Sequence, residues 1–342
     1  MKKILALLSL VVLLVSCGKG EQNNKNILYL YGWADYVPTE IYEKFEKETG
    51  IKVVEDIYSS NEEMFAKIMA GGTGYDILTP STDYAEILMN EGKLEKLDKS
   101  KLPTFKNIDP MVLEKLQYFD KNNDYAVPYV MGATAIVVNT KYVKNFPKDF
   151  TIYNDSAYKG KMTLLDDMRE VMTSALGTLG YSQTTSNEAE IAQAANLVKE
   201  WKKNIAKFDS ESFGKGFANE DFWVVHCYPE NVYSELNADQ LKHTQLIIPE
   251  KGGTSYIDSF VVLKNAPHKE AAYKFLEFIH RPENYKLVAE HLKLPSINVP
   301  ARKLITVQPM YQIDALKNTQ ILRDIKNTLD LQNKYWQEIL VD

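Results

Sequence analysis

The first part of the folded chain alternates between short apolar strands and amphipathic helices, and this order constrains the fold more than any other feature. The runs at 27–31, 51–58 and 76–78 are each predicted to be strands. A helical pattern that ends near a glycine follows each of them. An order of β-α-β-α-β-α favours a parallel sheet covered by helices, and the ligands of such sheets bind beyond the carboxyl ends of the strands.

Helix starts in this chain carry a recurring acidic pattern. Three segments place an acid three residues after a serine or an aspartate: Ser60-x-x-Glu63, Asp83-x-x-Glu86 and Asp167-x-x-Glu170. In a capping box the first side chain accepts a hydrogen bond from a backbone N–H of the helix, and the second side chain bonds back. Taken alone, each pair is therefore predicted to cap a helix.

Two long apolar segments predict that the chain passes between two lobes. Residues 125–139 are nearly uncharged and contain Pro128 and Gly132, so they are too long and too interrupted for one ordinary strand. Residues 256–263 form a second crossing candidate. We therefore expect two lobes that are each discontinuous in sequence, residues 27–131 with 257–302 and residues 132–256 with 303–342. The final helix is predicted over residues 318–340.

The N-terminus predicts export. Lys2 and Lys3 precede the apolar run 4–15, as in a secretory signal peptide covering residues 1–16. The segment Leu-Val-Ser before Cys17 resembles a bacterial lipobox, which implies cleavage before Cys17 and acylation of that residue. The alternative is a plain signal peptide with an incidental cysteine. With acylation, residues 17–26 would be the lipidated cysteine and a flexible tether, and the protein would be anchored to a membrane in the bacterial periplasm or at the cell surface.

Composition excludes several classes of partner. The 342 residues carry a formal charge of −6, and removal of Lys2 and Lys3 with the leader makes it −8, so nucleic acid is not an expected partner. Five histidines and two cysteines make a metal site hard to build, and no cofactor is expected. No apolar stretch of about 20 residues follows the leader, so no transmembrane helix is expected in the body. Aromatic residues reach 11%, and 21 of them are tyrosines, which is the compositional feature that a function has to explain.

Motifs spread over nearly the whole mature chain resemble one family. They are Tyr31-Gly-Trp33-Ala-Asp35-Tyr36-Val-Pro38, Tyr75-Asp-Ile-Leu-Thr-Pro80-Ser81-Thr82, Asn122-Asn-Asp-Tyr-Ala-Val-Pro-Tyr129, Leu165-Asp-Asp167-Met-Arg-Glu170, and Gly252-Gly253 to Asp258-Ser259. In order and spacing they resemble the spermidine/putrescine-binding proteins of bacterial ABC importers. The resemblance implies an α/β fold of the two-lobed periplasmic-binding-protein-like type II. Each lobe would be a mixed sheet with flanking helices, joined to the other by crossing strands. The protein would be a monomer that closes on a polyamine and passes it to a membrane permease.

The resemblance also implies a set of ligand-binding residues. They are Trp33, Asp35, Tyr36, Ser81, Asp83, Asp167, Glu170, His226, Tyr256 and Asp258. A polyamine needs carboxylates spaced along a slot, with aromatic faces between them for its cationic and methylene groups. Helix N-termini at such a site are positive, so acids have to reverse the local sign. Asp258 is the strongest candidate, because an acid inside an apolar strand is costly without a partner. Asp83 could bind ligand or simply cap its helix.

The sequence departs from the family pattern in three places. His226 stands where the family often has tryptophan, and Trp223 or Tyr228 could supply the missing ring instead. Leu294 replaces an expected tyrosine, and Gln320 is the nearest candidate for an expected glutamine. These differences leave the preferred polyamine open.

Other functions are weaker fits to the sequence. A receptor of the same fold for another organic cation, thiamine or a quaternary amine, is the main alternative. The chain has no Gly-x-Ser-x-Gly or Walker motif, Cys227 lies in an apolar strand, and the histidines lack metal-ligand spacing, so we do not expect an enzyme. A surface adhesin is opposed by the placement of acids and aromatic residues.

Overall fold

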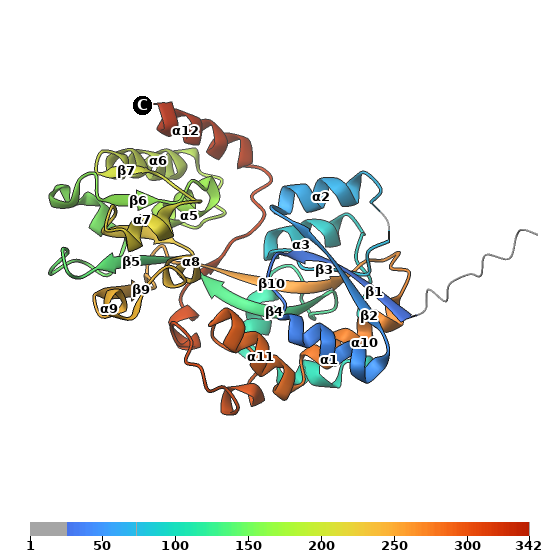
Figure 1. Ribbon diagram of the computed structural model, residues 1–342. Coiled ribbons are helices and arrows are strands. Elements are labelled where there is room, and N and C mark those ends of the chain that lie inside the picture. The colour runs from blue at the N-terminus through green and yellow to red at the C-terminus, as the bar shows by residue number, and fades with distance from the viewer. Residues whose placement is uncertain (1–25, 73, 342) are drawn as a thin grey trace, which may run out of the picture.

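Residues 26–72 and 74–341 are described by a computed structural model, in which two α/β lobes are joined by β4 and β10 (Figure 1). The predicted signal peptide, Cys17 and the tether up to residue 25 lie outside the described residues. Among the residues that are described, no helix combines the length and the apolar character needed to cross a membrane.

The first lobe is a mixed sheet with the strand order β11-β10-β3-β1-β2, in which β4 also pairs with β10. Its strands are β1 (Ile27–Trp33), β2 (Lys52–Tyr58), β3 (Ile77–Leu78), β4 (Ala126–Ala133), β10 (Thr254–Val262) and β11 (Gln320–Ile321). Its helices are α1 (Thr39–Thr49), α2 (Asn61–Met69), α3 (Thr82–Asn90), α4 (Pro110–Leu116), α10 (Lys269–Ile279) and α11 (Pro282–Leu292). Strands β1, β2 and β3 are parallel, as the alternation predicted, and β10 runs antiparallel to β3 and β4.

The second lobe is a mixed sheet with the order β7-β6-β8-β5-β9. Its strands are β5 (Ala135–Asn139), β6 (Met162–Leu164), β7 (Ile205–Phe208), β8 (Val224–Cys227) and β9 (Thr244–Ile247). Its helices are α5 (Met168–Thr178), α6 (Glu188–Lys202), α7 (Phe213–Ala218), α8 (Pro229–Tyr233), α9 (Ala238–Leu241) and α12 (Leu329–Val341). Each lobe has its own apolar core. The predicted fold class, two mixed sheets with flanking helices joined by crossing strands, is confirmed.

Local sequence signals explain the helix ends. Helix α1 follows Pro38 and stops at Gly50, whose φ of 69° is left-handed and suits glycine. Ser60 accepts a hydrogen bond from the Glu63 N–H at 3.1 Å, as predicted. The prediction that Asp83 caps α3 is wrong, because the helix begins at Thr82 and Ser81, two residues before Asp83, is its N-cap residue. Asp83 therefore lies within the first turn.

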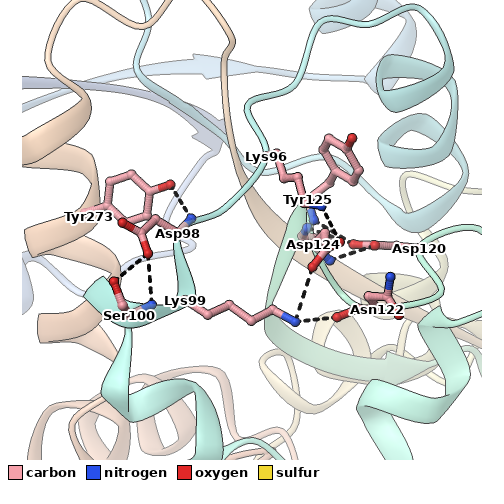
Figure 2. A network of polar contacts seen from close by, with 10 residues as sticks. Lys96, Asp98, Lys99, Ser100, Asp120, Asn122, Asp124, Tyr125 and Tyr273 are labelled. Atoms are coloured by element: carbon pink, nitrogen blue, oxygen red, sulfur yellow. Dashed lines mark hydrogen bonds and ion pairs between the residues drawn. The ribbon is translucent and has the colours of Figure 1, made fainter.

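The outer end of β4 is fixed by a polar network (Figure 2). The carboxylate of Asp120 accepts hydrogen bonds from the backbone N–H groups of Asp124 at 2.7 Å and Tyr125 at 2.8 Å. Asp124 in turn forms ion pairs with Lys96 at 3.1 Å and Lys99 at 3.6 Å. The loop that leads into the crossing strand is thereby tied to the first lobe.

The C-terminal segment differs from the expected division of the chain. Residues 303–342 were expected in the second lobe, but Tyr311, Leu316 and Ile321 are buried in the core of the first. The backbone at 320–321 pairs with β10, so the predicted helix over 318–340 begins only at Leu329. From there α12 covers the second lobe, and the residues before it form a further connection between the lobes (Figure 1). Strand β10 also belongs wholly to the first sheet, and β9 of the second sheet ends at Ile247, so the chain changes lobe between residues 247 and 254 rather than at 256.

Candidate binding site

Asp258 is a buried acid on β10 with one oxygen atom unpaired. Its side chain is 6% exposed, and the hydroxyl of Tyr36 donates a hydrogen bond to Oδ2. Oδ1 is buried and has no hydrogen-bond partner. Burial raises the pKa of Asp258 to about 7, and hydrogen bonds from Tyr36 and Ser81 oppose that rise. Asp258 can therefore accept a further donor, and a cationic donor would relieve the cost of its burial.

The loop after β1 turns Tyr36 toward Asp258 but leaves Asp35 at the surface. Asp35 adopts a left-handed φ of 55°, and its carbonyl accepts a hydrogen bond from Nε2 of His291 at 2.8 Å. The hydroxyl of Tyr129 donates to the carbonyl of Tyr36 at 2.8 Å. The Asp35 carboxylate is exposed, and its charge acts on Glu55 of the edge strand β2. The structure thus brings Tyr36 to the site and does not bring Asp35 there.

Trp33 and Ser81 lie on the same side of the first lobe as Asp258. The half-buried ring of Trp33 packs against Tyr58 at 4.5 Å between ring centroids, and its Nε1 is buried without a partner. The charge of Asp258 contributes to a raised pKa of Tyr58, which places this aromatic pair near the acid. Asn61 holds Ser81 by donating to its Oγ at 3.0 Å. These side chains give the first lobe an aromatic wall and a hydroxyl beside the acid.

The second lobe contributes Asp167 and Glu170 at the start of α5. Asp167 is the N-cap residue and accepts from the N–H groups of residues 169 and 170, so its predicted capping role is confirmed. Glu170 is 3% exposed and accepts hydrogen bonds from the hydroxyls of Thr254 and Thr134, the latter at 3.1 Å. Both threonines lie where the chain changes lobe. Burial and the nearby charge of Asp167 raise the pKa of Glu170 to about 8.

Asp83 and Arg169 face each other between the lobes. Asp83 lies on α3 of the first lobe, and burial raises its pKa to about 6, opposed by the charge of Arg169 on α5. Arg169 also donates to the carbonyl of Arg323 in the C-terminal connecting segment. One of the inter-lobe acids therefore has a basic residue opposite it.

Tyr256 and Glu230 form a second contact between the lobes. The hydroxyl of Tyr256, on β10, donates to Oε1 of Glu230, on α8, at 3.3 Å. The ring of Tyr256 lies over Gly132, where an added Cβ would come within 2.2 Å of it. Tyr228 packs against Tyr256 with its ring edge on, at 6.1 Å between centroids. Glycine at 132 is therefore a requirement for this position of the Tyr256 ring.

Tyr228 lies among acids from both lobes. Burial raises the pKa of its phenol well above the usual value, and the charges of four carboxylates contribute to that rise: Glu170, Asp167, Glu230 and Asp258. We call Asp83, Asp167, Glu170, Glu230 and Asp258 the inter-lobe group of acids. Aromatic rings lie among them, and the charge of Arg169 acts on Asp83, Asp167 and Glu170. Such an arrangement suits a ligand that is cationic along part of its length and apolar in between.

His226 is placed away from this group, contrary to the prediction. Its ring is fully buried in the core of the second lobe and meets Phe150 edge on at 5.1 Å. Burial lowers its pKa to about 3, so the ring is neutral. Trp223 stacks on Tyr142 at the opposite end of β8. Of the three rings proposed to replace the family tryptophan, the structure therefore brings Tyr228 to the site.

Glu230 and Tyr311 also lie at the site, although neither was among the residues predicted from the sequence. Glu230 follows an apolar strand and lies in the first turn of a short helix, a position comparable to that of Glu170 in α5. An acid just after a buried strand is therefore the sequence signal that marks residue 230. Tyr311 carried no signal, because only the path of the C-terminal segment brings its hydroxyl to the backbone N–H of Ala133 at 3.1 Å.

Comparison with known proteins assigns the chain to a family. A family model described as bacterial extracellular solute-binding protein matches residues 40–316. The chain belongs to this family. The spermidine/putrescine-binding periplasmic protein of Escherichia coli K12 is 36% identical, and the match covers 97% of each chain. The putrescine-binding periplasmic protein SpuD of Pseudomonas aeruginosa is 32% identical over 84% of this chain and 83% of its own.

Solved structures agree with these relatives. The crystal structure of the TpPotD lipoprotein of Treponema pallidum has a TM-score of 0.88 and 37% identity, covering 92% of this chain and 99% of that one. A spermidine/putrescine substrate-binding protein of Streptococcus pneumoniae has a TM-score of 0.83 and 25% identity, covering the same shares of the two chains. This solute-binding protein is therefore similar to polyamine receptors over its whole folded length.

Proposed function

We propose that the protein is an extracytoplasmic receptor that captures a polyamine, putrescine or spermidine, between its lobes and delivers it to the permease of an ABC importer. The observation that supports this most directly is the inter-lobe group of acids around Tyr228. Buried carboxylates without basic partners are costly, and ammonium groups of a ligand would offset that cost. The names of the relatives point to the same ligand class.

The proposed mechanism is closure of the lobes around the ligand. The first lobe supplies Asp83 and Asp258, and the second supplies Asp167, Glu170 and Glu230. A ligand that pairs with acids of both lobes stabilises the closed arrangement. Thr134 and Thr254, which bond Glu170, lie at the points where the chain changes lobe. An ammonium group bound at Glu170 would therefore alter the contacts of the two segments that connect the lobes. The protein acts by binding and release, without catalysis.

The remaining parts of the proposal concern location and assembly. Cleavage before Cys17 and its acylation would hold the protein on a membrane through a flexible tether, facing the periplasm or the cell surface. One chain supplies both sides of the site, so a monomer is sufficient for binding. Radiolabelled fatty acid incorporation, compared between wild type and Cys17→Ser, tests the anchor separately from ligand binding.

Calorimetric titration of soluble residues 18–342 with putrescine and spermidine tests the function. Three or four charged contacts should give binding near micromolar, about −8 kcal/mol. Thiamine and choline serve as matched cations of the alternative ligand class, and butylamine as a single-ammonium control. Absence of both heat and thermal stabilisation with either polyamine would refute the proposal, and tighter binding of thiamine or choline would replace it with the alternative.

A further inference from the structure

Glu230 has one carboxylate oxygen bonded and the other unpaired. Oε1 accepts the bond from Tyr256, whereas Oε2 is buried and has no partner. Burial raises the pKa of this acid to about 7, opposed only by its own backbone N–H and by the Tyr256 hydroxyl. Its position thus offers an acceptor that no protein group uses.

Aromatic rings surround this acceptor. The charge of Glu230 contributes to the raised pKa of Tyr228, Tyr256 and Tyr311, so all three phenols lie close to it. The faces of such rings attract cations and cover methylene groups. Glu230 also acts on Asp258, whose Oδ1 is a second buried carboxylate oxygen without a partner. Two acids with unpaired buried oxygens, one from each lobe, therefore lie close enough for their charges to interact.

The number of charges at the site indicates which charge on a ligand it matches best. The charge of Arg169 acts on Asp83, Asp167 and Glu170, and Asp167 also accepts hydrogen bonds from backbone N–H groups at the start of α5. When all are ionised, the five acids of the inter-lobe group and Arg169 carry four net negative charges, and no basic residue acts on Glu230 or Asp258 among the described causes of their pKa shifts. A dication would leave two of these negative charges without an opposite charge, whereas a trication would leave one.

We propose that Glu230 binds the additional ammonium centre of a triamine and so makes this site select a triamine over a diamine. The inference rests on the proposed function, because it assigns one residue of that site to one group of the ligand. Tyr256 holds the carboxylate from the opposite lobe, and the rings of Tyr228 and Tyr311 cover the methylenes next to the bound amine.

The test compares wild type and Glu230→Gln with putrescine and spermidine by calorimetry at one pH and ionic strength. Loss of a charged hydrogen bond should weaken spermidine binding by about 10- to 100-fold and putrescine binding by less than about 3-fold. Glu235→Gln, at an exposed position just after α8, is the matched control and should change neither. Glu230→Ala repeats the loss of charge without the amide, and circular dichroism with thermal unfolding confirms that both variants fold.

The outcomes separate this inference from the function on which it rests. Equal weakening of both polyamines would overturn it, because Glu230 would then bind an ammonium group that both ligands share. Unchanged spermidine binding in both folded variants would overturn it as well. If wild type binds neither polyamine, the proposed function itself fails.

Discussion

Replacing Asp258 by asparagine removes one charge from the site while keeping the shape of the side chain. The amide oxygen can still accept the Tyr36 hydroxyl, so packing in the first lobe should be preserved. What is lost is the negative charge at the unpaired oxygen, Oδ1. Removing one partner of a buried charge pair weakens binding by about 2–5 kcal/mol, or roughly 30- to 5,000-fold in Kd.

The assay is calorimetric titration with putrescine and spermidine at pH 8, about one unit above the carboxyl pKa of about 7. At pH 7 the Asp258 carboxyl is protonated in about half of the wild-type molecules, which would hide part of the effect of removing its charge. Glu46→Gln, an exposed acid on α1, is the control. The ligand-free variant should be at least as stable as wild type, because a buried charge has been removed. A loss below 3-fold with normal folding would refute the role of Asp258, and so would an equal loss in the control.

Further tests concern the pH dependence of binding, the glycine beside Tyr256, and His226. First, the raised pKa values of Glu170 (about 8), Glu230 and Asp258 (both about 7) mean that these acids must lose protons to pair with ammonium groups. Affinity should therefore rise between pH 6 and 8 with proton release, measurable by calorimetry in two buffers, whereas constant affinity would contradict it. Second, Gly132→Ala should weaken binding by at least about 10-fold, since its methyl group meets a tyrosine ring of the site; unchanged binding would show that this ring is not needed. Third, His226→Leu should leave affinity within about 3-fold and not lower the melting temperature, because both ring nitrogens are buried without partners; a large loss would return the histidine to the site.

Much of the first lobe could be predicted from local patterns. The strands predicted at 27–31 and 51–58 agree with β1 and β2 within two residues, because apolar periodicity and helix-ending glycines agree there. The last helix is predicted to begin about ten residues too early, because the sequence around Gln320 and Ile321 is equally compatible with a helix. Only pairing with β10 and burial of Ile321 in the first lobe decide that they form a strand. Contacts across a long stretch of sequence are not visible in a local pattern.

The site was predictable only in part for a similar reason. The family motifs assigned Tyr36, Tyr256 and Asp258, and the structure brings these residues together with acids of the second lobe. Strand β8 is buried along its whole length, so alternation could not tell which of its side chains points toward the ligand side. His226 was therefore chosen by its family position, while Tyr228, just past the end of the strand, lies at the site.

The inter-lobe acids make closure of the lobes depend on ligand charge. Bringing Glu230 of the second lobe to Tyr256 and Asp258 of the first places carboxylates near one another in a buried space. Without a cation, that arrangement requires these acids either to repel one another or to bind protons. A polyamine removes both costs, because its charges replace the protons and its methylenes cover the tyrosine rings. The same residues can thus favour an open form when no ligand is bound and a closed form when it is, because the free energy of closure changes with the charge between the lobes.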